Sequence, residues 1–412
     1  MSPPSQKFFL GRQPILDRDQ EIVGYELLFR AAEKNVAEIE SYSRACASVI
    51  EGALSTFGIQ DVLGSKFGFI NVHEGILLSE MLELLPTEQS VLELLEFIEL
   101  DDQVIERCRE LKGIGFRIAL DDHQYDPVHS AFYDLVDIIK IDLLQTDPEK
   151  LPEIVRELRK YPLKILAEKV ETIEQFEACH KMGFDLFQGY FFERPVVLKR
   201  KRFDVSGLSM LKLLQQLIND APLNIIEQTF KENPALSYNL LRLVNSVGIG
   251  LREKIKTLRH AILMLGTGHL RRWIQLSLFA GNDTRGVNSP LLEMAAVRGR
   301  LMEVIVNMKS GAKGGGEFAE EAFMTGILSL LDVLFENAME EVISNLNLSE
   351  DVAQALLHRT GRLGELLALA ECLEKADFDA AVPLMESCGV SLDDLLSAQL
   401  EAFNWKSSVV VE

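Results

Sequence analysis

Acidic and amide side chains stand at the ends of apolar, strand-like runs throughout the first half of this chain. These runs are Ile22–Glu26, Phe67–Asn71, Val91–Glu93, Phe116–Asp122, Ile138–Asp142 and Leu163–Glu168. The carboxyl ends of parallel strands gather at one face of a barrel, so these polar ends would meet there. Carboxylate and amide oxygens are the ligands that hard divalent cations prefer. The pattern therefore predicts a metal site made of Glu26, Asn71, Glu93, Asp121 and Asp122.

The setting of these acids distinguishes them from ordinary surface charges. A single Asp or Glu is usually a solvated surface residue, but Ala119–Asp122 and Leu166–Glu168 place acids inside or directly after apolar segments. Burying a carboxylate without a partner costs several kcal/mol. Several acids that converge at strand ends therefore require metal cations, arginines or lysines beside them.

The strand-like runs alternate with helical patterns from about residue 8 to residue 195. Helices are expected at Ser41–Phe57, Asp102–Leu111 and Pro152–Lys160. Alternation of this kind is typical of an α/β protein with a parallel sheet or barrel. The sequence thus predicts an α/β barrel domain over residues 1–198.

The pattern changes after Pro195, where strand-like runs largely vanish. The basic stretch Lys199–Arg202 is interpreted as a solvated linker, residues 199–205, in preference to a phosphate or nucleic-acid site. Helical patterns then follow one another, beginning clearly at Asn233-Pro234, where Asn can cap a helix and Pro suits its first position. Residues 206–412 are predicted to form an all-α domain.

Composition limits the classes of function. The net charge of −21 argues against a protein that coats nucleic acid, although a metal pair could still hold a small phosphorylated ligand. No run approaches the roughly 18 apolar residues that a membrane helix needs. The five cysteines are scattered and form no CxxC pair, which indicates reduced thiols and a cytoplasmic protein.

A series of motifs along residues 8–195 carries a family resemblance. In chain order they are Gln13-Pro14-Ile15, Gly24–Arg30, Asn71, Glu93 with Glu96, Asp121-Asp122, Lys140-Ile141-Asp142, Glu168–Glu171 and Gln188-Gly189-Tyr190. Together they resemble EAL domains, which fold as TIM-like (β/α)8 barrels and hydrolyse the bacterial messenger cyclic di-GMP. The motif that names the family is relaxed here to Glu26-Leu27-Leu28.

The resemblance implies two-metal hydrolysis of cyclic di-GMP to the linear dinucleotide, with Mg²⁺ or Mn²⁺ in the predicted metal site and Asp121 as the bridge. Glu168 would be a general base or a second-metal ligand, and Lys140 would hold the attacking water. Glu171 and Gln188 would order the surrounding residues. The substrate-binding set would be Gln13, Arg30, Asp142 and Gln188.

Two departures from the family pattern leave an alternative open. The loop His123–Pro127 lacks the glycines usual after the Asp pair, and Lys169 replaces the glycine of Glu-Gly-Val-Glu. The loop change favours a catalytically weak cyclic di-GMP receptor or scaffold. Retention of the buried acids favours the enzyme, since a scaffold has no chemical reason to keep them.

The second half resembles the HDOD domain, a helical relative of the HD phosphohydrolases that lacks their metal site. Glu232–Leu236, Val244–Ser246 and Ala261–Gly266 carry this resemblance, and no histidine in the chain is followed by Asp. The resemblance implies a regulatory domain that docks a protein partner. Basic residues of this half are interpreted as solvated faces, not as a nucleic-acid surface. A homodimer through the EAL domain is left open.

Overall fold

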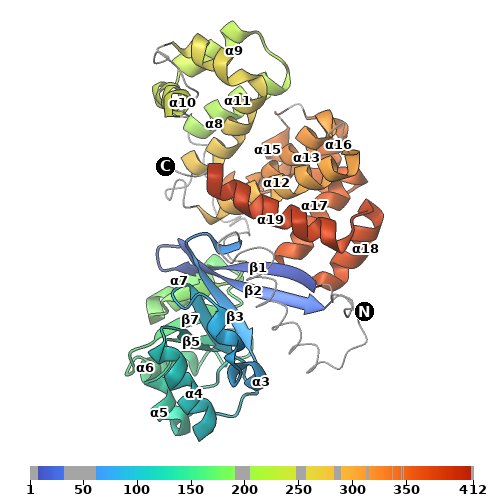
Figure 1. Cartoon of the computed structure of the whole chain (residues 1–412). Coiled ribbons are helices and arrows are strands. Elements are labelled where there is room, and N and C mark those ends of the chain that lie inside the picture. The colour runs from blue at the N-terminus through green and yellow to red at the C-terminus, as the bar shows by residue number, and fades with distance from the viewer. Residues whose placement is uncertain are drawn as a thin grey trace, which may run out of the picture. The chain divides into compact units, whose positions relative to one another are not determined.

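The chain forms two compact units, one of residues 1–194 with 368–412 and the other of residues 195–367 (Figure 1). The computed structural model describes residues 8–31, 62–190, 205–246, 257–282, 289–311, 315–335, 337–344, 346 and 348–409. The expected helix Ser41–Phe57 and the basic stretch Lys199–Arg202 lie outside the described residues.

A closed eight-stranded barrel, counted over the described residues, is the core of the first unit. Its strands are β1 (Phe8–Asp17), β2 (Ile22–Ala31), β3 (Phe67–Val72), β4 (Ser90–Leu94), β5 (Arg117–Leu120), β6 (Ile138–Asp142), β7 (Lys164–Glu168) and β8 (Leu186–Gln188). Strands β2 to β8 run parallel, whereas β1 is antiparallel to both neighbours. The barrel prediction is confirmed with this one difference. The short turn Arg18–Glu21 leaves no room for the crossover that a parallel β1–β2 pair would need.

The interior of the barrel carries an apolar layer directly beneath a polar one. The apolar layer consists of Ile15, Phe69, Val91, Ala119, Ile138, Leu166 and Leu186. Successive residues of a strand point to opposite faces, so the residue two positions along each strand points into the barrel as well. Those positions are occupied by Gln13, Asn71, Glu93, Asp121, Lys140, Glu168 and Gln188. The apolar layer thus supports a ring of polar side chains.

Helices connect the parallel strands on the outside of the barrel. They are α3 (Glu74–Leu77), η1 (Glu80–Leu84), α4 (Asp102–Gly113), η2 (Pro127–His129), α5 (Ser130–Tyr133), α6 (Leu151–Leu158) and α7 (Ile173–Met182). The predicted helices Asp102–Leu111 and Pro152–Lys160 are confirmed as α4 and α6. Asp101 caps α4 by accepting a hydrogen bond from Val104 N at 2.9 Å.

Strand β2 is longer than expected and continues past Glu26 to Ala31, so Glu26 lies in mid-strand. In the described residues β2 pairs with β3 only over Gly24–Leu27, while its pairing with β1 extends to Phe8 and Ala31. Residues 8–12 and 28–31 therefore form a two-stranded extension of the barrel, here called the hairpin arm.

The C-terminal helices α18 (Phe378–Cys388) and α19 (Leu392–Val409) pack on the hairpin arm. Phe9 stacks on Phe378 with ring centroids 5.3 Å apart, and Gln399 Nε2 donates to the carbonyl of Leu10 at 3.0 Å. An isolated two-stranded ribbon is marginally stable, so it gains from such a cover. Residues 368–412 therefore group with the barrel, which differs from the helical domain expected over 206–412.

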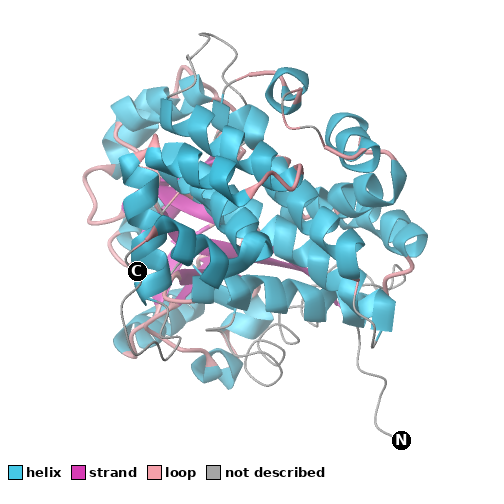
Figure 2. Cartoon of the chain, turned by 90° about the horizontal axis from the view of Figure 1, so that it is seen from above, coloured by secondary structure: helices cyan, strands magenta, loops and turns pink. Residues whose placement is uncertain are grey.

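Every regular element described in the second unit is a helix, as predicted. In the whole chain, helices (cyan) are more extensive than strands (magenta) in Figure 2. Its helices are α8 (Val205–Ile218), α9 (Leu223–Lys231), α10 (Pro234–Ser246), α11 (Leu258–Asn282), α12 (Pro290–Ser310), α13 (Gly316–Leu328), α14 (Leu331–Phe335), α15 (Met339–Ile343), α16 (Glu350–His358) and the start of α17 (Gly361–Glu374). Helices α12 and α13 cross at Gly299 and Gly326, where a Cβ on Gly326 would lie 2.6 Å from the Gly299 Cα. Only glycine permits this approach.

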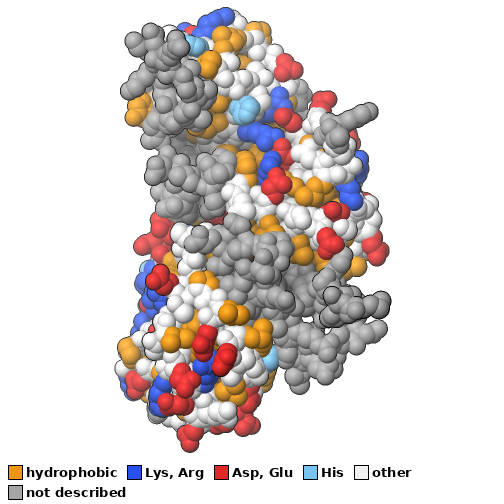
Figure 3. Space-filling view, in the orientation of Figure 1, with side chains coloured by type: hydrophobic (Ala, Val, Ile, Leu, Met, Phe, Trp, Pro, Cys, Tyr) orange, Lys and Arg blue, Asp and Glu red, His pale blue; other side chains and the backbone are white. Residues whose placement is uncertain are grey.

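Charged side chains of both signs are mixed over the face of the molecule in Figure 3. Some form pairs one helical turn apart, such as Arg109 with Glu106 at 2.8 Å, and exposed pairs of this kind stabilise little. Among the described residues, no helix is both long and apolar enough to cross a membrane.

Candidate active site

The Lys140 ammonium lies at the centre of the polar ring and is 1% exposed. In the described part of the chain, four carboxylates lie within 3.4 Å of its Nζ: Asp121 at 2.7 Å, Glu93 and Glu168 at 2.9 Å, and Glu26 at 3.4 Å. Each comes from a different strand or strand end. The structure thus brings together residues that are up to 142 positions apart, from Glu26 to Glu168.

Negative charge exceeds positive charge in this cluster, and the pKa values reflect it. Burial raises the pKa of Glu93 well above its usual value despite the nearby Lys140, and it raises the pKa of Asp121 too. Burial, together with the charges of Asp121 and Glu26, raises the pKa of Glu168 to about 8. Although burial opposes its charge, the four carboxylates raise the pKa of Lys140 well above its usual value.

Glu26 differs from the other three carboxylates around Lys140 in having a lowered pKa. Burial opposes its charge, but Lys140 and hydrogen bonds from Gln188 and Asn71 outweigh burial and lower its pKa. Gln188 Nε2 donates to Glu26 Oε2 at 2.6 Å and Asn71 Nδ2 donates to Oε1 at 2.9 Å. Gln13 Oε1 accepts from Gln188 Nε2 at 3.1 Å, and Gln13 Nε2 donates to the Tyr190 hydroxyl at 3.0 Å. The predicted residues Gln13, Asn71 and Gln188 thus all orient Glu26.

The donor atoms of the cluster suit divalent cations. Within the described residues, Glu93 Oε2 and Glu168 Oε2 are buried and accept no hydrogen bond. Oxygens of this kind, with an excess of negative charge, are what a hard cation requires. As the side chains stand, no three acidic, His or Cys side chains of the described chain are arranged to hold a metal. Because Lys140 Nζ lies between the carboxylates, metal binding would require it to shift.

Asp122, Asp142 and Lys169 lie at the edge of the cluster. Asp142 is 3% exposed. It accepts a hydrogen bond from Leu144 N at 2.6 Å and forms an ion pair with Lys169. Gln145 Nε2 donates to Asp122 Oδ2 at 3.4 Å. Lys169 has φ of 56°, in the region that favours glycine, which is the residue expected at this position from the resemblance to EAL domains. Its side chain points to Asp142 and places a cation beside the acids.

The motif glycine Gly189 has a steric role. Its φ is 144°, and a Cβ there would lie 2.2 Å from the carbonyl oxygen of Val170. Val170 N in turn donates to the carbonyl of Gln188 at 3.0 Å. The absence of a side chain at 189 therefore lets the loop after Glu168 close against Gln188.

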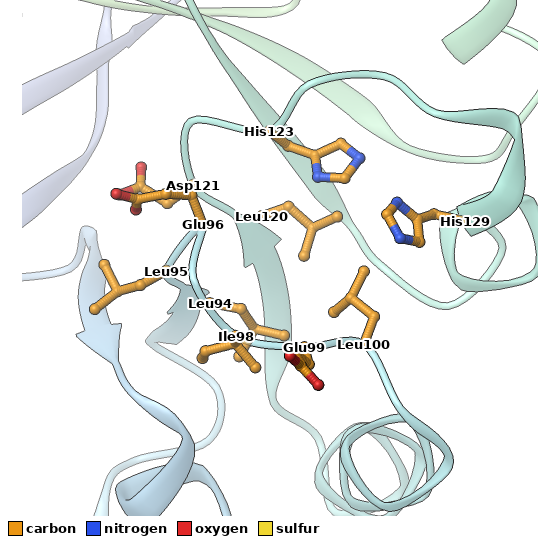
Figure 4. A pocket seen from close by; sticks show the side chains of 10 residues that line it. All are labelled: Leu94, Leu95, Glu96, Ile98, Glu99, Leu100, Leu120, Asp121, His123 and His129. Carbon is orange, nitrogen blue, oxygen red and sulfur yellow. The ribbon is translucent and has the colours of Figure 1, made fainter.

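A pocket of about 250 Å³ opens beside Asp121. Asp121 and Glu96 lie on one side of it, and His123 and His129 lie on the other (Figure 4). The loop after the Asp pair, His123–Pro127, forms part of this region. The hydroxyl of the buried Tyr133 lies 2.8 Å from His123 Nε2. It also donates a hydrogen bond to the Asp126 carbonyl and accepts one from the Asp126 N–H, each at 2.9 Å. Tyr133 thus fixes a loop that has no glycine.

Two predicted site residues, Glu171 and Arg30, form contacts with residues outside the cluster. The backbone N–H of Glu171 donates to Gln175 Oε1 at 2.8 Å, at the start of α7. Arg30, on the hairpin arm, forms a two-point ion pair with Asp379 of α18.

Comparisons with known proteins identify both domains of the chain. The sequence model of the EAL domain matches residues 73–195, and that of the HDOD domain matches residues 208–358. The chain is 31% identical to the cyclic di-GMP phosphodiesterase CdgJ of Vibrio cholerae, over 97% of this chain and 93% of that protein. This chain belongs to the EAL–HDOD family.

Two further proteins match this chain as well. YuxH of Bacillus subtilis is 30% identical over 97% of this EAL–HDOD chain and 98% of its own length. A solved EAL domain protein from Listeria monocytogenes is 25% identical, covering 46% of this chain and 88% of that one, with a TM-score of 0.38.

Several residues of this EAL–HDOD site were not found from the sequence. Nothing in the sequence except their aromatic character marked Tyr133 and His129 as residues of the site. Asp379 could not be linked to Arg30, because the two are 349 positions apart in the chain. Tyr190 was part of the Gln-Gly-Tyr motif, but its bond to Gln13 was not expected. Such partners meet only when the chain folds, because they come from separate elements.

His123 should make the stability of the EAL domain sensitive to mild acid. Burial, with a smaller effect of His129, lowers the pKa of His123 to about 4. An unfolded histidine titrates near 6.5 and therefore takes up a proton first as the pH falls. The contribution of neutral His123 to the unfolding free energy is therefore complete above about pH 6.5 and is lost as the pH falls towards 4. Between pH 7.5 and 5, wild type should lose about 1–2 kcal/mol more unfolding free energy than His123→Gln.

Urea unfolding of both proteins at the two pH values measures this difference. Parallel losses in wild type and His123→Gln would show that His123 does not stay neutral in the folded domain.

Proposed function

We propose that this EAL–HDOD protein is a metal-dependent phosphodiesterase that hydrolyses cyclic di-GMP to the linear dinucleotide. The observation that carries the proposal is the convergence of Glu26, Glu93, Asp121 and Glu168 on Lys140. It occurs in a chain that is 31% identical, over nearly its whole length, to a cyclic di-GMP phosphodiesterase. A fold alone would not identify the reaction, because function depends on the site.

Two divalent cations, Mg²⁺ or Mn²⁺, would be held by Glu26, Asn71, Glu93, Asp121 and Asp122. When bound, such cations stabilise charge on the attacking and leaving oxygens of an in-line displacement. Gln188 and Asn71 keep Glu26 ionised and fix its orientation through their hydrogen bonds.

Glu168 is the group suited to move a proton. Its pKa of about 8 lies close to neutral pH, where a general base or acid works best. Lys140 Nζ, 2.9 Å from Glu168 and 2.7 Å from Asp121, positions both carboxylates and would hold the attacking water. We assign Glu171 to the positioning of the loop after Glu168, because Gln175 holds its backbone.

Substrate contacts are assigned to Gln13, Arg30, Asp142 and Gln188. The two glutamine amides lie beside Glu26 at the barrel mouth. Arg30 suits a phosphate, because its planar fork can donate to two oxygens at once. Asp142 is 3% exposed and carries the ion pair to Lys169, so its contribution would be made largely through Lys169.

The HDOD domain is proposed to regulate the phosphodiesterase by docking a protein partner. We also place the protein in the cytoplasm, because the four cysteines of the described residues are free thiols.

The test is a chromatographic assay of cyclic di-GMP turnover with Mg²⁺, with Mn²⁺ and with a chelator. Wild type and Glu106→Gln, which alters an exposed acid on α4, should both form the linear dinucleotide when metal is present. Glu168→Ala should form none. If wild type leaves the dinucleotide intact, a binding titration decides the alternative: binding indicates a receptor, and no binding indicates a scaffold.

A further inference from the structure

Arg30 lies on the same side of β2 as Glu26. The two are four residues apart, and side chains two and four positions along a strand share a face. Because β2 continues beyond its pairing with β3, Arg30 is carried past the barrel mouth on the hairpin arm. This is the position from which a side chain can reach a ligand seated above the carboxylate cluster.

The guanidinium of Arg30 is already engaged by an acid. Its Nη1 donates to Asp379 Oδ2 at 2.8 Å and its Nη2 donates to Oδ1 at 2.9 Å. This is the two-point geometry that an arginine also uses to bind a phosphate. A phosphate bound in that way would need the same two donors, so Asp379 and a phosphate cannot occupy them together.

The packing of the C-terminal helices sets the position of Asp379. Asp377 caps α18, accepting from Ala380 N at 3.1 Å, so Asp379 falls in the first helical turn. The preceding Phe378 stacks on Phe9 of the hairpin arm. At Gly11 a Cβ would lie 3.1 Å from both Ala376 and Phe378, so the arm and the helix approach closely there. The first turn of α18 is thus held against the arm beside Arg30.

We infer that Asp379 occupies the phosphate-binding fork of Arg30, and that α18 thereby inhibits substrate binding by the EAL domain of its own chain. The inference rests on the proposed function, in which Arg30 meets a phosphate of cyclic di-GMP. It assigns to the C-terminal helices a role in the reaction besides covering the hairpin arm. Any partner that draws α18 away from the arm would then release Arg30 and activate the domain.

The inhibition is weak enough for substrate to overcome it. The side chains of Arg30 and Asp379 are 45% and 56% exposed, and an exposed ion pair of this kind changes an equilibrium by about two- to fivefold. The structure therefore assigns Asp379 a moderate effect on affinity and none on the chemical step, because Asp379 is outside the carboxylate cluster.

The experiment measures KM and kcat for cyclic di-GMP, and its binding constant, in the full-length protein. Asp379→Asn should lower KM and Kd about two- to fivefold with kcat unchanged. Asp379→Ser, a residue tolerated in a first helical turn, should do the same. The control is Glu386→Gln, which removes one charge from the exposed face of the same helix and should change neither constant.

A double-mutant cycle separates a specific pair from a general charge effect. Arg30→Ala alone should raise Kd, and in that background Asp379→Asn should leave Kd unchanged. If Asp379→Asn still lowers Kd in the Arg30→Ala background, the inference is overturned, because the effect would then come from general repulsion between the Asp379 carboxylate and the phosphates of the ligand. If wild type binds cyclic di-GMP and both Asp379 variants bind it with the same Kd as wild type, the inference is overturned but the proposed function is not. No binding and no turnover by wild type or either Asp379 variant would overturn the proposed function together with it.

Discussion

Glu26→Ala should reduce the hydrolysis of cyclic di-GMP by about 10³-fold in kcat/KM. The pKa of Glu26 is lowered by Lys140 and by its hydrogen bonds, and Gln188, Asn71 and Lys140 all donate to it. Its removal takes away one proposed metal ligand and one acceptor of the Gln188 and Asn71 amides. The measurement is the initial rate of linear dinucleotide formation at saturating metal.

The barrel should remain folded in this variant, because the cluster has more negative than positive charge and loses one of its carboxylates. Circular dichroism and the unfolding midpoint check the fold, with Glu106→Ala on the exposed face of α4 as the matched control. Turnover that equals wild type in folded Glu26→Ala would remove Glu26 from the metal site.

Lys140→Met should lower the unfolding free energy of the metal-free protein by about 3–5 kcal/mol. Four carboxylates, three of them buried, would then face one another with no ammonium among them, and part of the cost would be met by protonation of Glu93 and Glu168. Because the variant no longer places a cation at the centre of the cluster, added Mn²⁺ should raise its unfolding temperature more than that of wild type. Hydrolysis should be lost at the same time.

The measurement is thermal unfolding in chelator and in Mn²⁺. Lys164→Met is the matched control, because Lys164 begins the neighbouring strand β7 with an exposed side chain. Its stability should match that of wild type in both buffers. An equal effect of Mn²⁺ on wild type and Lys140→Met would argue against metal binding among these carboxylates.

The helical domain shows where local patterns suffice and where they do not. The start of α10 at Pro234 was expected from Asn233-Pro234, because capping depends on neighbouring residues. The placement of α18 and α19 on the hairpin arm was not expected. An apolar helix face does not specify its partner, and contacts with the arm, among them those of Phe378 and Gln399, place these helices with the barrel.

Much of the barrel could be derived from the sequence alone. The runs that end in Asn71, Glu93 and Glu168 have a period of two, which places an apolar residue two positions before each of these polar residues on the same face. Strand β1 and the continuation of β2 beyond Glu26 were missed, because the pairing of β1 with β2 depends on the turn Arg18–Glu21 and on the neighbouring strands.

The sequence by itself determined which residue types could form the site: carboxylates, amides and a lysine at the ends of apolar strands. The tertiary structure decided how they are paired. It placed the Lys140 ammonium among four acids, and it set Asp379 against Arg30 across 349 positions of the chain. The physical reason is that strand periodicity is a local property, whereas ion pairs depend on distances that exist only once the barrel has closed and the C-terminal helices have packed on it.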